Sequence, residues 1–354
     1  MAQKPAITGF EVIQFDLPPM EDMGTDYNGF NSVYEKGTTT PRQGSVLRMF
    51  TSVGVTAEIA SGAGLVAQAR YRNYLLGKNP LERERIYQDL KRALRQQARM
   101  GMAQIDVLLW DFAGKYYNAP VFELLGGHIK PLPCYASTTH GDHNGGLDSP
   151  QAYADFAERC LEMGYPAFKI HGWGNSETEL EIANIHKVGQ RVGGKMDLLI
   201  DPACELETFG DALKVGWACD EEKFFWLEDP YKDGGISQFA HRKLRQMLRT
   251  PLLLTEHVRT LEPHVDFALA DATDFIRGDI GYDGITGVMK LAHACEGLGI
   301  DIEMHGPGPA QRHCMTSIRN TNYYEMGLVH PNNKGTFVTH LYTNYEDGLE
   351  AIDA

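Results

Sequence analysis

The pattern of hydrophobic and polar positions differs between the first third of the chain and the remainder. Residues 7–17 alternate between apolar and polar side chains, which is typical of a strand, and residues 44–60 predict a hairpin. Helical spacing predicts one helix over residues 79–100 and two shorter helices over residues 102–127, where a Gly-Gly pair ends the pattern. These elements together indicate an α+β domain over residues 1–128.

Residues 18–43, between the first strand and the hairpin, contain glycine, proline, asparagine and aspartate but show no hydrophobic periodicity. Long aperiodic stretches inside compact proteins are usually functional or mobile. We therefore expect an irregular, mobile segment that closes over the active site and contributes to specificity.

From residue 129 onwards, short apolar runs alternate with segments of helical spacing. This alternation predicts βα units with parallel strands, and about eight units in succession favour a closed barrel over an open sheet. The eight predicted strands are residues 132–138, 167–173, 197–203, 224–230, 252–258, 275–280, 300–306 and 323–329.

Three acidic residues end consecutive predicted strands at nearly equal intervals: Asp201, Glu228 and Glu256. The carboxyl ends of barrel strands meet at one mouth, so these carboxylates should converge there. Any one of them alone is more simply a surface residue, but three converging like charges require a cation. An all-oxygen set of ligands suits Mg²⁺, or Mn²⁺, better than zinc.

Candidate proton-transfer residues lie on the strands that flank these acids. Lys169 and His171 are two residues apart and therefore share one face of their strand. Asp279 and His305 end the sixth and seventh strands, where the carboxylate can orient the imidazole and raise its basicity. A single histidine is more often structural, but this pairing favours a catalytic dyad. Glu325 on the eighth strand is a further inward-facing acid.

These motifs together resemble those of the mandelate racemase group of the enolase superfamily. The matching features are DFAGKYYNAPVFELLGG before the barrel, Lys-x-His on the second strand, the Asp/Glu/Glu series, an aspartate before a glycine-containing turn, and the late histidine. The resemblance covers almost the whole chain. It implies an α/β fold with a (β/α)7β TIM-like barrel over residues 129–330, an α+β capping domain over residues 1–128, and a segment over residues 331–354 that packs back on the cap.

The resemblance also implies roles for the site residues. His305 and Asp279 would form the general base/acid dyad, Glu325 would hydrogen-bond the substrate, and Lys169 would contact the substrate carboxylate. One Mg²⁺ per subunit would be bound by Asp201, Glu228 and Glu256.

Two departures from the group's pattern bear on the reaction. His171 replaces the second lysine of the usual Lys-x-Lys, and simple racemisation, which needs competent bases on both faces, is therefore less expected. Ala203 replaces an asparagine that often follows the first metal ligand. The Lys-x-x-Lys pattern of the muconate-cycloisomerase relatives is absent from the fifth strand, where His257 stands, and this favours the racemase-like group.

Three functions are compatible with these residues. Removing a proton α to a carboxylate builds an enediolate, which a divalent cation stabilises. The first interpretation is dehydration of a sugar acid to a 2-keto-3-deoxy acid in carbohydrate catabolism, and the second is a racemase, epimerase or cycloisomerase acting on a related hydroxy acid or sugar-acid lactone. A non-catalytic binding barrel is the third, and the complete acid set disfavours it. Candidate substrate-binding residues are Tyr27, His140 and His257, although a polar surface loop explains His140 equally well.

Composition narrows the partners and the location. The formal net charge of −14 argues against a nucleic-acid backbone or an anionic membrane as partner. The six cysteines are scattered without C-x-x-C spacing, as in a reduced cytoplasmic protein. We see no signal peptide and no apolar run approaching the roughly 20 residues of a membrane span. We expect a cytoplasmic homo-oligomer, between a dimer and an octamer, that acts on a small carboxylate substrate.

Overall fold

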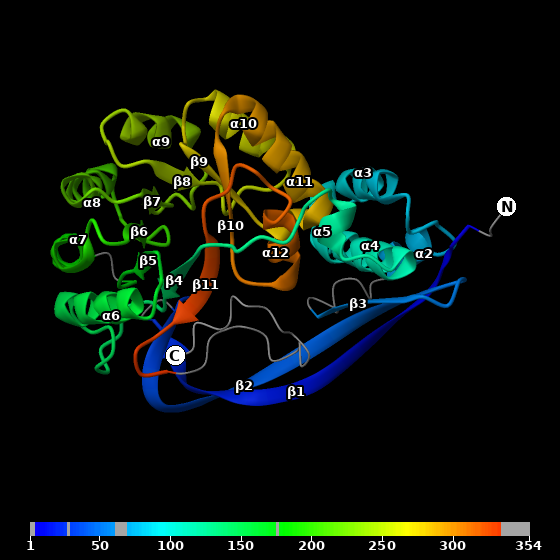
Figure 1. Cartoon of the computed structure of the whole chain (residues 1–354), viewed down its shortest axis with the longest axis horizontal. Coiled ribbons are helices and arrows are strands. Elements are labelled where there is room, and N and C mark those ends of the chain that lie inside the picture. Colours follow the sequence, from blue (N-terminus) through cyan, green and yellow to red (C-terminus); the bar gives the residue numbers. More distant parts are fainter. Residues whose placement is uncertain (1–3, 27–28, 61–68, 175–176, 334–354) are drawn as a thin grey trace.

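Two structural units follow each other along the chain in the computed structural model, which describes residues 4–26, 29–60, 69–174 and 177–333. The first is a cap formed by an antiparallel sheet and a group of helices. The second is a barrel of parallel strands with helices around its outside (Figure 1). A long ribbon of two strands extends from the cap helices to the barrel, and the cap helix α4 (Met102–Tyr117) also lies beside the barrel helix α11 (Ile280–Leu298) (Figure 1).

The sheet of the cap has the strand order β1-β2-β3, and both of its pairs are antiparallel. The pairing of β2 with β3 confirms the hairpin that the sequence predicts. The strands are β1 (Ile7–Thr25), β2 (Ser32–Thr51) and β3 (Thr56–Ala60). The helical segments are α2 (Ala69–Leu75), α3 (Arg83–Ala93), the 3₁₀ turn η1 (Arg95–Gln97), α4 (Met102–Tyr117) and α5 (Val121–Leu124).

The core of the cap follows from two periodicities. Leu47 and Met49 lie two residues apart on β2 and therefore point to the same face of the sheet. Ile105, Leu109 and Phe112 recur at helical spacing along α4 and form one apolar stripe. The two sets belong to a single buried cluster, so sheet and helix pack face to face.

The expectation of an irregular segment over residues 18–43 is wrong for its described residues. β1 and β2 continue through most of it as a paired ribbon, with Leu17 opposite Arg42 and Met20 opposite Thr40. The register shifts between Leu17 and Met20, and such bulges interrupt the alternation that reveals a strand in a sequence. Most side chains of the ribbon are partly or fully exposed, so neither face requires a continuous apolar row.

The helix predicted over residues 79–100 is also shorter in the structure. α3 spans only Arg83–Ala93, because the chain around Pro80 forms a turn before the helix. Beyond the 3₁₀ turn, Ala98 and Arg99 adopt positive φ angles of 47° and 60°, which a right-handed helix cannot contain.

Eight parallel strands form the barrel, and each of the eight predicted runs contains one of them. Their order in the sheet is β10-β9-β8-β7-β6-β5-β4-β11. The strands are β4 (Cys134–Thr138), β5 (Ala167–His171), β6 (Asp197–Asp201), β7 (Trp226–Glu228), β8 (Leu252–Leu254), β9 (Phe275–Gly278), β10 (Asp301–Met304) and β11 (Tyr324–Val329).

A helix follows each strand from β4 to β10, so the chain makes seven βα units and ends the sheet with β11. This is a TIM-like barrel with a capping domain, as expected from the sequence. The helices are α6 (Pro150–Glu162), α7 (Thr178–Val192), α8 (Phe209–Glu222), α9 (Gln238–Arg245), α10 (Leu261–Leu269), α11 (Ile280–Leu298) and α12 (Pro309–Met315).

Aromatic and aliphatic side chains fill the barrel below its mouth. Trp226 is fully buried, with ring centroids 5.7 Å from Tyr135, 5.5 Å from Phe225 and 6.1 Å from Phe275. Tyr135, Trp226 and Phe275 point inward, so the next inward position along each of these strands, two residues later, lies at the mouth. On β7 that residue is Glu228, and the apolar packing therefore supports the polar site directly.

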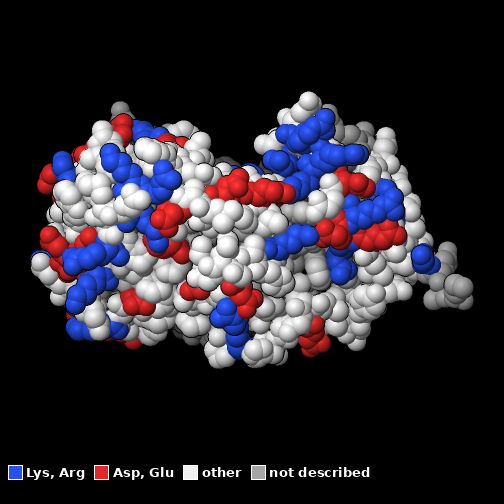
Figure 2. Space-filling view, turned by 90° about the horizontal axis from the view of Figure 1, so that it is seen from above, with Lys and Arg blue, Asp and Glu red and all other residues white. Residues whose placement is uncertain are grey.

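The surface adds two observations. None of the described helices combines the length and apolar character that a membrane span requires. On the face shown in Figure 2, basic and acidic side chains are interspersed, and the surface is hollowed between two lobes.

Replacing Trp226 by alanine should lower the free energy of unfolding by about 3–5 kcal/mol, because it opens a large cavity under the site. Urea denaturation followed by circular dichroism measures the change. Trp217 on α8 is 48% exposed and provides the matched control. Trp217→Ala should cost less than about 1 kcal/mol, and equal losses in the two variants would contradict the proposed packing.

Candidate active site

Three carboxylates converge at the mouth of the barrel. Asp201 ends β6, Glu228 ends β7, and Glu256 lies two residues beyond the end of β8. One carboxylate oxygen from each lies within 4.8 Å of the other two. The structure therefore brings together the three acids that the sequence analysis selects as metal ligands.

Glu256 reaches this group by a departure from strand geometry. Leu253 of β8 packs inside the barrel, so strict alternation would direct Glu256 to the outer face. Thr255 has a φ of 88°, an uncommon conformation for a β-branched residue, and it breaks the alternation immediately before Glu256. Backbone strain of this kind is often found at functional sites.

The electrostatics of the three acids fit a divalent cation. Glu228 is fully buried, and burial raises the pKa of its carboxyl group to about 8 despite the nearby cations Arg277 and Lys169. Asp201 and Glu256 raise this pKa further, because like charges oppose ionisation. A bound cation would reverse these effects, and an all-oxygen donor set of this kind suits Mg²⁺.

Two buried cations lie among the carboxylates. Lys169 Nζ is 3.1 Å from Glu228 Oε2 and 3.0 Å from Glu325 Oε1. Arg277 Nε is 2.8 Å from Glu228 Oε1, and Arg277 Nη2 is 3.2 Å from Glu325 Oε2. Burial opposes the charge on each cation, but Glu228 and Glu325 hold the pKa values of both cations well above their ordinary range.

Arg277 was not among the predicted site residues. It occurs in an Arg-Gly-Asp tripeptide on β9 and lies two residues before Asp279. Residues two apart on a strand share a face, so the same periodicity that selects Asp279 also directs Arg277 into the barrel. The alternation of side chains along a strand is therefore the signal that could have identified Arg277.

His305 and Asp279 form the expected pair. The Nδ1 atom of His305 is 2.8 Å from Asp279 Oδ2, and its Nε2 atom faces Glu256 Oε1 at 3.4 Å. Burial would lower the pKa of His305, but Glu256 and Asp279 raise it to about 9. A cation bound to Glu256 would offset the effect of that carboxylate and shift the imidazole toward the neutral form that a base requires.

His171 and His140 lie on the other flank of the acids. His171 Nδ1 is 2.8 Å from the carbonyl oxygen of Thr138, and Nε2 is 3.2 Å from Asp201 Oδ2. The ring of His140 is 4.8 Å from that of His171, and burial together with His171 lowers the pKa of His140 to about 3. His140 is therefore a neutral, buried neighbour of His171 rather than part of an exposed polar loop.

The tip of the β1–β2 ribbon reaches the barrel beside these histidines. The backbone N–H of His140 donates to the carbonyl of Ser32 at 3.0 Å. A cavity of about 470 Å³ lies between the ribbon and the loops of the barrel, lined in part by Asp26 and Glu35 from the ribbon and by Asp142 and Trp173 from the barrel. The ribbon and the barrel therefore share the wall of this cavity.

The other two predicted substrate-binding residues are Tyr27 and His257. Tyr27 lies outside the described residues, as does the end of the C-terminal segment, residues 334–354. His257 is 41% exposed and faces Asp229, with Nε2 3.6 Å from Oδ2, in a group separate from the three acids. Contact of His257 or Tyr27 with a substrate stays a prediction.

Comparison with known protein families identifies the family to which this chain belongs. Residues 152–352 match the family described as enolase C-terminal domain-like, and residues 44–126 match the mandelate racemase/muconate lactonizing enzyme N-terminal domain. The chain belongs to the mandelate racemase/muconate lactonizing enzyme family of the enolase superfamily.

Characterised members of this family include similar proteins with different reactions. The chain is 27% identical over 250 residues to an L-talarate/galactarate dehydratase of Salmonella typhimurium, covering 68% of this chain and 61% of that protein. It is 30% identical over 252 residues to a D-galactarolactone cycloisomerase of Agrobacterium fabrum, covering 68% and 63%. The chain thus spans less than two thirds of the length of each of these relatives.

A solved structure in the same superfamily extends the comparison. The D-glucarate dehydratase of Agrobacterium tumefaciens, complexed with magnesium, superposes with a TM-score of 0.84 and 26% identity. The match covers 92% of this chain and 87% of that chain. The capped barrel is therefore shared across nearly the full length of the described chain.

Replacing Arg277 by methionine should lower the free energy of unfolding by about 3–5 kcal/mol, because Glu228 and Glu325 each lose a buried partner. Chemical denaturation without added metal measures this loss. The matched control is Arg319→Met, since the side chain of Arg319 is 73% exposed although its Nε lies 2.7 Å from Glu296. We expect no measurable loss in that variant. A similar stability for both variants would show that the buried network is not needed for folding.

Proposed function

We propose that this chain is a Mg²⁺-dependent enzyme that abstracts the proton α to a carboxylate, and that its reaction dehydrates a sugar acid to a 2-keto-3-deoxy acid. The observation that carries the proposal is the convergence of Asp201, Glu228 and Glu256, flanked by His305 on one side and His171 on the other. The similarity to an L-talarate/galactarate dehydratase supports the same chemistry.

Each residue has a role that follows from its surroundings. Asp201, Glu228 and Glu256 would hold Mg²⁺, or Mn²⁺, and the bound ion would supply positive charge where the enediolate develops. His305 would accept the α-proton at Nε2, because Asp279 occupies Nδ1 and fixes the orientation of the ring.

Three further residues would complete the reaction. Lys169 would lie near the substrate carboxylate and add positive charge there. Glu325 is oriented by the backbone N–H of Gly306, which donates to Glu325 Oε2 at 2.7 Å, and it would accept a hydrogen bond from the substrate. His171 has both ring nitrogens next to acceptor oxygens, an arrangement suited to a proton donor, and it would protonate the departing hydroxyl group.

A racemase, epimerase or cycloisomerase is the second candidate. Two histidines approach the acids from different flanks, and reprotonation on the face opposite to His305 would require a group in the position of His171. The 30% identity to a D-galactarolactone cycloisomerase favours this alternative. Dehydration is preferred because it requires only one effective base, whereas racemisation requires two.

A library of mono- and diacid sugars incubated with Mg²⁺ separates the candidates. Semicarbazide traps 2-keto products and reveals dehydration, while polarimetry and nuclear magnetic resonance reveal isomers of unchanged composition. We expect a trapped keto acid from at least one sugar acid. Isomerisation without keto product would establish the second candidate, and no turnover of any acid would oppose both.

Replacing Glu228 by glutamine should weaken Mg²⁺ binding and lower kcat/KM by roughly a hundredfold or more, since metal stabilisation of the enediolate contributes several kcal/mol. Calorimetry measures ion binding and steady-state kinetics measures turnover. The control is Glu262→Gln, because Glu262 is 65% exposed and pairs with Lys91 outside the site. Unchanged Mg²⁺ affinity in Glu228→Gln would remove Glu228 from the ligand set.

Replacing His305 by asparagine should abolish exchange of the substrate α-proton with deuterated solvent and leave Mg²⁺ binding intact. The reason is that asparagine keeps a polar group near Asp279 but cannot accept the proton. Nuclear magnetic resonance of the substrate in deuterium oxide follows the exchange. His171→Ala should slow turnover yet still permit exchange. Full exchange in the His305 variant would transfer the role of base to the side of Lys169 and His171.

A further inference from the structure

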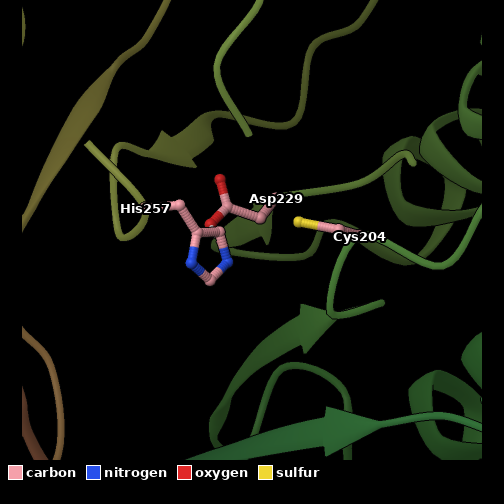
Figure 3. A group of neighbouring side chains, drawn as sticks. All are labelled: Cys204, Asp229 and His257. Atoms are coloured by element: carbon pink, nitrogen blue, oxygen red, sulfur yellow. The ribbon is translucent and has the colours of Figure 1, made fainter. Parts of the chain in front are cut away.

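A second group of potential ligands lies next to the three acids. It consists of Cys204, Asp229 and His257, shown in Figure 3. Asp229 and His257 directly follow Glu228 and Glu256 in the chain, and Cys204 lies in the loop after β6. We propose that these three side chains form a second metal site, which binds a transition-metal ion of the zinc type.

The geometry of the group is close to that of a zinc site. The sulfur of Cys204, a carboxylate oxygen of Asp229 and a ring nitrogen of His257 all lie within 4.8 Å of one another. The thiol is directed toward the carboxylate and the imidazole (Figure 3). Bonds of about 2.0–2.3 Å in a tetrahedron separate ligand atoms by roughly 3.3–3.8 Å. His257 Nε2 and Asp229 Oδ2 already lie 3.6 Å apart, and the 4.8 Å limit leaves the other pairs at most about 1.5 Å to close. The side chain of His257 is 41% exposed and has room to make this movement.

Asp229 provides independent evidence for a positively charged ligand. It is only 1% exposed, and no described residue donates a hydrogen bond to either of its carboxylate oxygens. The imidazole of His257 is 3.6 Å away, beyond hydrogen-bond distance. A buried carboxylate without a donor is costly, because it has lost water and gained no partner. A metal ion between Asp229, Cys204 and His257 would remove this cost.

The backbone holds Cys204 and Asp229 in this arrangement. The N–H of Cys204 donates to the carbonyl oxygen of Asp229 at 2.8 Å, and Leu206 pairs with Tyr231 a few residues further along the same two loops. At Gly235, a Cβ atom would lie 2.6 Å from Asp229 Oδ1, so a larger residue would push the carboxylate away. The backbone hydrogen bond and the close approach of Gly235 thus fix the position of the Asp229 carboxylate.

The donor atoms distinguish this site from the neighbouring one. Thiolate, imidazole and carboxylate together suit zinc and related ions, whereas the three acids at the mouth offer only oxygen. Three protein ligands leave one coordination position open, and the exposure of His257 means that water can reach it. The two sites should therefore select different ions from the same solution.

Protection of Cys204 from alkylation tests the proposal without any reference to turnover. Cys204 is the one cysteine of the six that is not buried, so iodoacetamide should label it first. We expect one equivalent of Zn²⁺ to slow this labelling at least tenfold, as measured by mass spectrometry of the peptide, whereas millimolar Mg²⁺ should not. Asp229→Asn and His257→Ala should each abolish the protection. Labelling that Zn²⁺ does not slow, or protection that survives in both variants, would overturn the site.

Cobalt substitution gives a second measurement. Co²⁺ bound to a thiolate shows a sulfur-to-metal charge-transfer absorption in the near ultraviolet, which an all-oxygen site cannot produce. We expect this absorption in the wild-type protein saturated with Mg²⁺, its loss in Cys204→Ser, and its retention in Cys134→Ser, where a buried cysteine of β4 is changed. If a variant fails to fold by circular dichroism, the wild-type absorption and its displacement by Zn²⁺ still decide the question. Absence of the band in the wild-type protein would refute the proposal.

Discussion

The mouth of the barrel depends on a buried network in which Lys169 and Arg277 each pair with the carboxylates of both Glu228 and Glu325. All four residues are nearly or completely inaccessible, so each charge has exchanged water for its partners. Removing one member leaves an unpaired buried charge, which is far more costly than losing a surface ion pair. The network therefore fixes the strand ends to one another and orients Glu228 before any ion binds. A bound cation would compete with Lys169 for the same oxygens.

The alternation of side chains along the strands explains how one barrel end carries two kinds of chemistry. Inward positions supply oxygen ligands, and the residue after Glu228 turns away from that group and joins Cys204 and His257. The left-handed conformation of Thr255 adjusts this pattern at β8, so that Glu256 still reaches the mouth. The oxygen-only group and the group of Cys204, Asp229 and His257 therefore include residues that are neighbours in the chain.

The described part of the cap contributes one wall of a cavity beside the barrel. Its ribbon extends along β1 and β2 until the backbone of Ser32 bonds to that of His140 at the barrel. The acidic side chains Asp26 and Glu35 line the cavity formed there, together with residues from the barrel loops.

The sequence by itself determined the eight strands and the helices between them, because strands buried on both faces require runs of apolar residues. It also determined the three acids, because a charged residue at the end of an apolar run is easily recognised. It also paired Asp279 with His305, since both end adjacent strands. Only the tertiary structure decided the rest. The part of the ribbon within residues 18–43 escaped detection because bulges and exposure on both faces remove its periodicity. The importance of Arg277 and Asp229 follows from their burial and from neighbours that are distant in the sequence. The free energy of a buried charge depends on those neighbours and not on the residue alone.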